Sequence, residues 1–304
     1  MSRGVSRTSE WGRDNGLTFR MFGVMFLLIA LYLGFMAVLV VSGTEFTFIA
    51  IIAIGILGVQ YFFSDKLALW SVGAKEVTPE QAPELHAMVE RLAQIADLPK
   101  PKVAVADTNV PNAFATGRNP NNAAVAVTRG LMSRLNREEL EGVIAHELAH
   151  IRNRDVMVMT LASFFAVVAQ MIMRMMFFTG AGRQRGGGNN GAGAIMLVWL
   201  ASLLVWVISY FLIRALSRYR EFAADRGAAL ITGSPQALIS ALMKISGVMD
   251  RVPQQDLREV SDMNAFFIIP AASGGGFSEI FSTHPALERR IESLRELQRQ
   301  MEGM

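Results

Sequence analysis

The sequence predicts a mainly α-helical integral membrane protein, in which four transmembrane helices are joined to a polar α+β domain with a small β-sheet. Three observations lead to this fold class. Hydrophobic residues make up 52% of the 304-residue chain, more than in an ordinary soluble domain. Most of them lie in long runs that are almost free of charge. The remaining sequence forms two polar segments in which apolar residues recur with helical or strand spacing.

Four apolar runs form the predicted membrane part. Residues 21–41 and 46–63 are separated only by the short sequence SGTE, and residues 156–178 and 194–213 by a Gly-rich stretch. A helix needs about 20 apolar residues to cross a bilayer core of about 30 Å, so each pair is expected to form a transmembrane hairpin. Core helices of a soluble protein are the competing interpretation, but they are usually shorter. Arg174 lies near the end of the third run, where its long side chain can reach the interface.

The apolar runs divide the chain into alternating polar and apolar parts. These are an N-terminal tail (1–20), a first hairpin (21–63), a polar segment (64–155), a second hairpin (156–213) and a C-terminal polar segment (214–304). Four arginines in the tail place it in the cytoplasm by the positive-inside rule. Because each hairpin crosses twice, both polar segments are expected on the cytoplasmic side. Arg183 and Arg185, between the third and fourth runs, oppose this orientation but are outnumbered.

Composition excludes several kinds of chemistry. The count of 0 cysteines rules out disulfides, cysteine-ligated zinc and thiol nucleophiles. The net charge of +3 comes mostly from arginines that flank the apolar runs. This distribution indicates contact with a lipid bilayer and not with nucleic acid.

The polar segments combine amphipathic helices with short strands. In the first, helices are expected within residues 78–98 and 133–155, and strands within 100–107 and 122–130. Asn136 followed by Glu139 predicts a capping box at the start of the second helix. The C-terminal segment is expected to form helices within the regions 234–245 and 284–298, with a loop at 268–283 between them.

The sequence HELAH places two histidines four residues apart on a predicted helix. His146 and His150 therefore project from one face and can share a metal ion, for which neutral imidazole favours Zn²⁺. Glu147 lies beside that ion, where it can act as the general base that takes a proton from water. The chain has only 4 histidines, which makes a chance match improbable. Two surface histidines on a polar helix are the competing interpretation.

A third ligand is expected where the chain leaves the last apolar run. A catalytic zinc needs three protein ligands and one open position. Glu221 is the first carboxylate after residue 213, roughly two helical turns beyond it. Asp225 lies four residues further on the same face and could accept a hydrogen bond from a ligand imidazole. Without the two histidines, this stretch would be interpreted as a charged juxtamembrane helix.

The sequences HELAHIRNRD and SRYREFAAD, together with the two flanking hairpins, resemble the HtpX family of membrane zinc metalloproteases, which are relatives of the CAAX prenyl proteases. The resemblance implies a zincin-like catalytic domain that binds one Zn²⁺ through His146, His150 and Glu221, with Glu147 as general base. Asp225 matches the aspartate that follows the third ligand in the family. These implied roles agree with the reasoning from spacing.

Further roles rest on the resemblance. It implies that Asn112, Ala113 and Phe114 hold the substrate backbone. It also places His284, in the sequence STHPALERR, and Arg290 near the transition-state oxyanion. Asn112 could equally be a turn residue, and His284 could cap or pack a helix. Sheet-edge binding of an extended peptide gives the substrate assignment a physical basis.

The expected function is hydrolysis of peptide bonds by a zinc endopeptidase. The family resemblance implies location in the bacterial inner membrane, a cytoplasmic catalytic domain, and damaged or misfolded membrane proteins as substrates. An intramembrane protease is disfavoured because the residues that precede the HELAH sequence are highly charged. The alternative is a non-proteolytic four-span membrane protein with a structural metal site, which would be closed by a fourth protein ligand.

Overall fold

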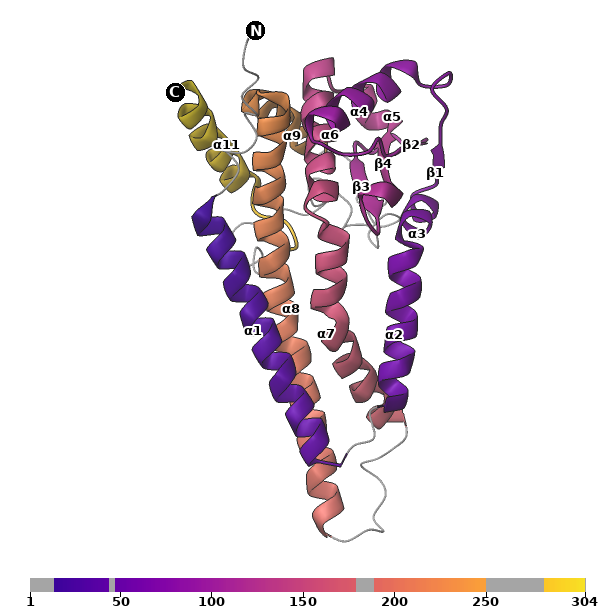
Figure 1. Cartoon of the computed structure of the whole chain (residues 1–304), viewed down its shortest axis with the longest axis vertical. Helices are drawn as coiled ribbons and strands as arrows, with labels where there is room; N and C mark the ends of the chain where they lie inside the picture. Colours follow the sequence, from indigo (N-terminus) through magenta and orange to yellow (C-terminus); the bar gives the residue numbers. More distant parts are fainter. Residues whose placement is uncertain (1–13, 44–46, 179–188, 250–281, 304) are drawn as a thin grey trace.

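A computed structural model of the chain describes residues 14–43, 47–178, 189–249 and 282–303. Long helices form one end of the molecule, and a small sheet with shorter helices forms the other (Figure 1). Three expected features lie wholly or mostly outside the described residues. They are the first three arginines of the tail, the Gly-rich stretch after residue 178 and the loop at 268–283.

Three helices in the described part of the chain are long and apolar enough to cross a membrane. They are α1 (Asn15–Val41), α7 (Asp155–Phe178) and α8 (Asn189–Thr232). The second predicted span forms α2 (Thr47–Phe62), an apolar helix of only 16 residues. Four spans were expected. The structure agrees with the first, third and fourth of them and forms a shorter apolar helix at the second. Within this bundle α1 packs against α8, and α2 packs against α7 (Figure 1).

Helix α8 connects the bundle to the polar domain without a break. It has 44 residues, and a helix of that length extends about 66 Å. The expected boundary between residues 213 and 214 therefore lies inside one continuous helix. The helix ends before Gly233, whose φ of 70° suits a helix C-terminus and favours glycine. The polar residues that follow the apolar run therefore belong to the same continuous helix, α8, as the apolar run itself.

The sheet has the strand order β1-β2-β4-β3. Its strands are β1 (Ala74–Glu76), β2 (Lys102–Ala106), β3 (Ala113–Gly117) and β4 (Ala123–Thr128). Strands β2 and β4 lie where the sequence predicts strands and pair in parallel, whereas β1 and β3 lie outside the predicted strands and pair antiparallel at the two edges. Gly117 ends β3 with a φ of 123°, and a Cβ there would lie 2.1 Å from the Asn122 carbonyl oxygen, so only glycine fits.

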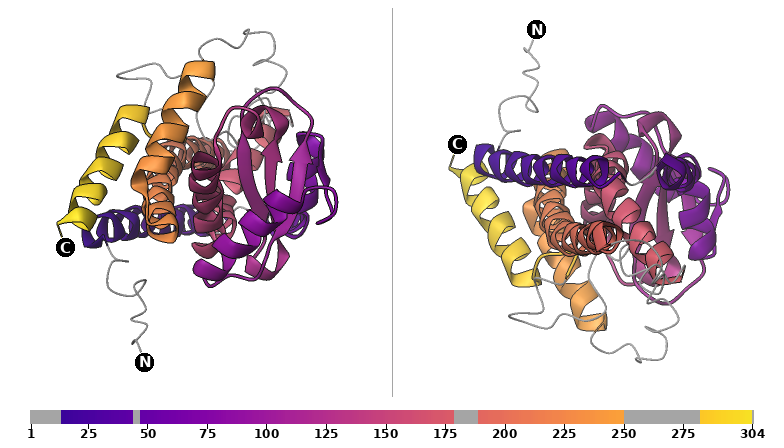
Figure 2. Two further views of the ribbon diagram at one scale, coloured as in Figure 1. Left: turned by 90° about the horizontal axis from the view of Figure 1, so that it is seen from above. Right: turned by 90° about the horizontal axis from the view of Figure 1, so that it is seen from below.

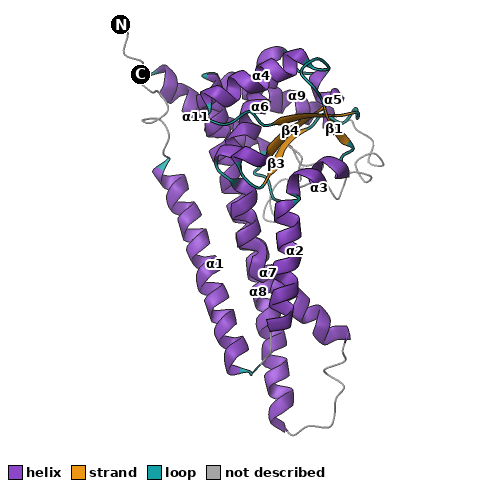
Figure 3. Cartoon of the chain, turned by 45° about the vertical axis from the view of Figure 1, so that its right-hand side comes forward, coloured by secondary structure: helices purple, strands orange, loops and turns teal. Residues whose placement is uncertain are grey.

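Shorter helices surround the sheet and the end of α8. They are α3 (Ser64–Ser71), α4 (Pro83–Ile95), α5 (Arg129–Met132), α6 (Arg137–Arg152), α9 (Pro235–Met249) and α11 (Leu287–Glu302), with a 3₁₀ turn at Pro120–Asn122. Figure 2 shows the layers in order: α11, then α9 with the end of α8, then α6, then the sheet. Colouring by secondary structure places the only described strands at this end of the molecule, with α3 between α2 and the sheet (Figure 3).

Helix α6 is anchored at its start and closely packed near its end. The predicted capping box is present, because the Asn136 side chain accepts from the Glu139 N–H and the Glu139 carboxylate accepts from the Asn136 N–H. Glu139 also accepts hydrogen bonds from Ser240 at 2.6 Å and from Lys244 at 2.8 Å, which tie α6 to α9. Towards its end α6 crosses α8 at a point where a Cβ on Gly227 would lie 2.7 Å from the Ala149 Cβ. This close approach brings the two helices into contact beside the histidines.

Candidate metal centre

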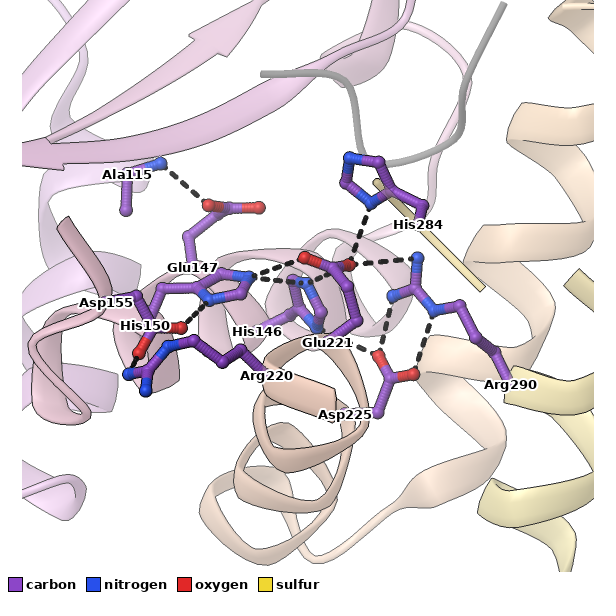
Figure 4. A network of polar contacts seen from close by, with 10 residues as sticks. All are labelled: Ala115, His146, Glu147, His150, Asp155, Arg220, Glu221, Asp225, His284 and Arg290. Atoms are coloured by element: carbon purple, nitrogen blue, oxygen red, sulfur yellow. Dashed lines mark hydrogen bonds and ion pairs between the residues drawn. The ribbon is translucent and has the colours of Figure 1, made fainter. Parts of the chain in front are cut away.

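The two histidines of the HELAH sequence face each other from consecutive turns of α6. His146 is 1% exposed, and its ring is perpendicular to that of His150, with the ring centroids 4.7 Å apart. The Nε2 atoms of the two rings are separated by 3.1 Å (Figure 4). The helical repeat therefore aims one nitrogen of each ring at a common point, as the sequence predicts.

Helix α8 supplies the third group at that point. Glu221 Oε2 lies 3.7 Å from His146 Nε2, and Glu221 Oε1 lies 3.5 Å from His150 Nε2. Tetrahedral ligands at 2.0–2.1 Å from a zinc ion lie about 3.3 Å from one another. The measured separations are close to this value, so the three side chains fit the ligand set of one small cation. Within the described ranges, they also form the group of histidine and acidic side chains whose ligand atoms lie close enough together to hold one metal ion.

A carboxylate holds the second nitrogen of each imidazole. His146 Nδ1 lies 2.9 Å from Asp225 Oδ1, and His150 Nδ1 lies 2.5 Å from Asp155 Oδ2. Such contacts fix the tautomer that leaves Nε2 free for a metal, and they make the imidazole more basic. Burial opposes the charged form of His146, but its hydrogen bonds with Asp225 and Glu221 outweigh burial and raise its pKa to about 9.

Two arginines in turn bind these carboxylates. Arg290 from α11 donates to both oxygens of Asp225, at 2.8 Å from Nε and 2.6 Å from Nη2. Burial opposes the charge on Arg290, but Asp225 and then Glu221 raise its pKa well above the ordinary value. Arg220 pairs with Asp155 and donates to the Asn153 carbonyl oxygen at 2.8 Å. The charges around the centre therefore alternate, which compensates for their burial.

Glu147 lies next to the three candidate ligands and is oriented by the sheet. Its Oε2 accepts a hydrogen bond from the backbone N–H of Ala115 in β3 at 2.7 Å. The side chain is buried, and burial raises its pKa above the ordinary value for glutamate. A carboxyl group with a raised pKa is a better proton acceptor and donor near neutral pH.

His284 and Arg290 reach the same centre from the C-terminal segment. His284 Nδ1 lies 3.0 Å from Glu221 Oε2, and Arg290 Nη1 lies 3.5 Å from that oxygen. The His284 segment is attached to α8, because Arg218 donates to the Ser282 carbonyl oxygen at 3.0 Å. The structure therefore places both residues beside Glu221. Their role near the transition-state oxyanion stays a prediction.

The proposed substrate residues lie at the start of edge strand β3. Asn112 is buried, and its backbone is joined to β4 through Thr128, whose Oγ1 accepts from the Asn112 N–H at 2.9 Å. Ala113 and Phe114 begin the strand that continues to Ala115 and the Glu147 contact. The segment thus belongs to an edge of the sheet, and Ala115 of the same strand lies beside Glu147 (Figure 4).

Three participants were not anticipated from the sequence: Asp155, Arg220 and the N–H of Ala115. Asp155 stands five residues after His150, within HELAHIRNRD. A carboxylate that closely follows a ligand histidine was the available signal, since such histidines commonly donate to one. Arg220 and Ala115 carried no comparable signal, because their positions depend on packing between α8, α7 and β3.

A cavity of about 680 Å³ opens beside this centre. Phe114, Glu147 and His284 line it at the polar end. It continues along one face of α7, where the lining side chains are Val156, Met159, Ser163 and Val167. This spacing corresponds to roughly three helical turns, so the cavity extends from the metal centre into the apolar bundle.

Known proteins of similar sequence are proteases. The sequence profile of peptidase family M48 matches residues 79–298. "Protease HtpX homolog" of Moorella thermoacetica is 62% identical over 297 residues, which cover 96% of this chain and 98% of that protein. "Protease HtpX homolog 2" of Methanosarcina acetivorans is 56% identical over 293 residues, which cover 96% and 99% of the two chains.

A solved structure shows a related fold. Ste24p of S. mikatae matches with a TM-score of 0.52 and 17% sequence identity, and the match covers 87% of this chain and 62% of that one. At this identity the likeness concerns the fold alone. The protease relatives do not favour the alternative of a non-proteolytic protein with a structural metal. Because the profile covers well over half of the chain and close relatives share almost its full length, this protein belongs to peptidase family M48 and is a membrane metalloprotease.

Proposed function

We propose that this chain is a zinc endopeptidase that cleaves damaged or misfolded membrane proteins close to the membrane surface. One observation carries the proposal. His146, His150 and Glu221 converge on one point beside the buried carboxylate of Glu147, and an apolar cavity leads from that point along α7. The centre thus has both a ligand set for a cation and access for an apolar substrate.

Zinc is the metal that the donor set favours. Two imidazoles and one carboxylate form the His₂Glu combination of catalytic zinc sites, whose fourth position stays open. The mutual distances of these donor atoms fit a small tetrahedral ion, and Asp225 and Asp155 hold the imidazoles in the required tautomer. When bound here, Zn²⁺ would polarise the scissile carbonyl group and lower the pKa of water toward about 7.

Glu147 moves the protons of the reaction. It takes one proton from the attacking water and later passes it to the leaving amine, for which its raised pKa is suited. The Ala115 N–H holds one carboxylate oxygen, which leaves the other oxygen for proton transfer. His284 would stabilise the oxyanion: its Nε2 makes no hydrogen bond within the described part of the chain, and the residue lines the cavity. Arg290 supports the site through Asp225.

Strand β3 is the site proposed for the substrate backbone. Its position at the sheet edge allows an extended peptide to add as a further strand, with Asn112, Ala113 and Phe114 forming the first part of that edge. A peptide bound there would pass Glu147, because Ala115 of the same strand contacts that carboxylate. Backbone pairing of this kind tolerates many sequences, as removal of damaged proteins requires.

The proposed placement has the polar domain in the cytoplasm at the bacterial inner membrane. Arginines in the N-terminal tail and after the last apolar run support this orientation by the positive-inside rule. Helix α2 would form the fourth crossing: its 16 residues are short, but α3 follows within two residues and its apolar side chains can lie in the interface. Cleavage would then occur at the cytoplasmic face.

A test of this proposal compares one polar cleavable segment in two forms. The segment is presented either fused to a transmembrane helix or as a free soluble peptide, to zinc-loaded enzyme in lipid nanodiscs. We expect kcat/KM to be at least about tenfold higher for the anchored form, because membrane attachment raises the effective substrate concentration. Equal kcat/KM values for the two forms would contradict the proposal. Cleavage that persists after zinc has been removed by chelation would contradict it as well.

Asp155→Asn is expected to weaken zinc binding by about 10- to 100-fold, the range typical of carboxylates that support ligand histidines. The amide keeps the size of the side chain but not the charge that holds His150 Nδ1 at 2.5 Å. The dissociation constant for zinc can be measured by chelator competition. Asp107→Asn is the matched control, since Asp107 is 89% exposed. An unchanged constant in Asp155→Asn would refute the supporting role.

A further inference from the structure

The junction between α2 and α3 exposes large apolar side chains at the end of the bundle. Trp70 is 81% exposed, Phe62 58% and Phe63 48%. Phe62 ends α2 and Trp70 lies in α3, and α3 separates the apolar helix α2 from the sheet of the polar domain (Figure 3). Aromatic side chains are enriched at this depth of a membrane, where lipid head groups meet the hydrocarbon core. The junction is therefore expected to lie at the level of the head groups.

A second cavity, of about 600 Å³, opens at this junction. Its lining includes four cationic side chains and one acidic side chain: Lys66, Lys100, Lys102, Arg118 and Asp65. The positive charges come from α3, β2 and the segments beside the sheet, so tertiary folding brings them together. The lining also includes the apolar side chains of Val59, Phe62 and Phe63. A strongly cationic cavity with an apolar wall is complementary to an anionic group attached to hydrocarbon chains.

Existing contacts leave the three lysines available for a ligand, whereas Arg118 is held in place because its Nη2 donates to Asn122 Oδ1 at 3.0 Å. Lys100 pairs with Glu90 at 2.8 Å and Lys102 with Glu76 at 3.3 Å, and neither glutamate lines the cavity. Exposed ion pairs of this kind contribute little free energy, so an incoming anion can replace them. Lys66 Nζ lies 5.8 Å from the centroid of the Phe63 ring, which keeps this charge beside the apolar wall.

Arg118 connects the cavity with the active site. It directly follows edge strand β3, and its Nη1 donates to the Phe62 carbonyl oxygen at 3.3 Å. The Tyr61 hydroxyl donates back to the Arg118 carbonyl oxygen at 3.0 Å. The end of α2 is thus attached to the end of the strand that contacts Glu147. An anion bound at Arg118 would therefore contact the point where the end of α2 is attached to the end of β3.

We propose that this cavity binds the phosphate head group of an anionic phospholipid. The phosphate would lie among Lys66, Lys100, Lys102 and Arg118, and the acyl chains would lie along Val59, Phe62 and Phe63 of α2. Bound lipid would hold α2 against the end of β3. This site is separate from the metal centre, and neither zinc nor peptide hydrolysis is needed for it to bind lipid.

The test measures retained lipid by native mass spectrometry of the full-length protein in detergent. Phosphatidylglycerol and phosphatidylcholine with identical acyl chains are supplied in equal amounts. Wild type is expected to retain phosphatidylglycerol preferentially. The triple variant Lys66→Gln/Lys100→Gln/Lys102→Gln is expected to bind it at least about tenfold more weakly, with phosphatidylcholine binding unchanged. Thermal stabilisation by each lipid, measured in parallel, should follow the same order.

A control with the same loss of charge is Arg91→Gln/Arg137→Gln/Arg295→Gln, whose residues lie on α4, α6 and α11, away from the cavity. It should retain phosphatidylglycerol as wild type does. Equal loss in the control would show that only net charge matters and would overturn the site. Equal retention by wild type and the lysine variant would overturn it too. Displacement of the lipid by millimolar inorganic phosphate would identify a free-phosphate site instead.

Discussion

Replacement of Glu147 by glutamine is expected to reduce peptide hydrolysis by about 10³-fold while zinc content stays at the wild-type level. Glutamine keeps the length of the side chain and an oxygen that can accept from the Ala115 N–H. It cannot accept a proton from water at neutral pH. General acid–base catalysis contributes about 10²- to 10⁴-fold, so kcat/KM should fall by about 10³-fold. Cleavage assays and elemental analysis on the same samples measure the two quantities.

The matched control for this variant is Glu138→Gln, because Glu138 lies exposed in the first turn of the same helix. It should keep full activity. Wild-type activity in Glu147→Gln would show that another residue transfers the proton. Loss of zinc together with activity would show that Glu147 supports the ligands, and the assigned role would then be wrong.

Glu221→Ala is expected to lose the metal and, as a consequence, all activity. The substitution leaves two imidazoles, which hold zinc far less tightly than the three ligands of a catalytic site. We expect zinc content after dialysis to fall below about one-tenth of the wild-type value. Circular dichroism should be unchanged in shape, since α8 is a continuous helix whose core contacts do not depend on this carboxylate.

Glu288→Ala provides the control for this second variant, because Glu288 is an exposed carboxylate at the start of α11. It should retain zinc and activity. Full zinc occupancy in Glu221→Ala would place the third ligand elsewhere. Collapse of the helical signal would mean that the loss of metal reflects unfolding, and the conservative variant Glu221→Gln would then separate the two effects.

Local sequence patterns predicted the features that depend on residues close together in the sequence. The capping box at Asn136, the strands β2 and β4, and the spacing of His146 and His150 all depend on residues within a few positions of one another. Backbone periodicity is sufficient for such features, since a helix turns every 3.6 residues wherever it lies. Strands β1 and β3 were outside the predicted strands because they are edge elements that their pairing partners define, and β1 has only 3 residues.

Long-range contacts decided the rest of the site. Arg290 binds Asp225 across 65 positions of sequence, and Arg220 reaches the Asn153 carbonyl oxygen across 67. Asp155 was within reach of local reasoning, but its role depends on the turn between α6 and α7 that directs it back to His150. The cationic cavity at α2 and α3 likewise combines lysines and an arginine from separate elements.

The sequence by itself determined that this protein has long apolar helices, a helix with two histidines on one face, and a carboxylate at the end of the last apolar run. Only the tertiary structure decided that Glu221 lies 3.5 Å from His150, that Ala115 orients Glu147, and that the cavity extends along α7. The physical reason is that helical periodicity fixes directions within one element. The distance between two elements depends instead on how closely they pack, and here the contact between Gly227 and Ala149 sets it.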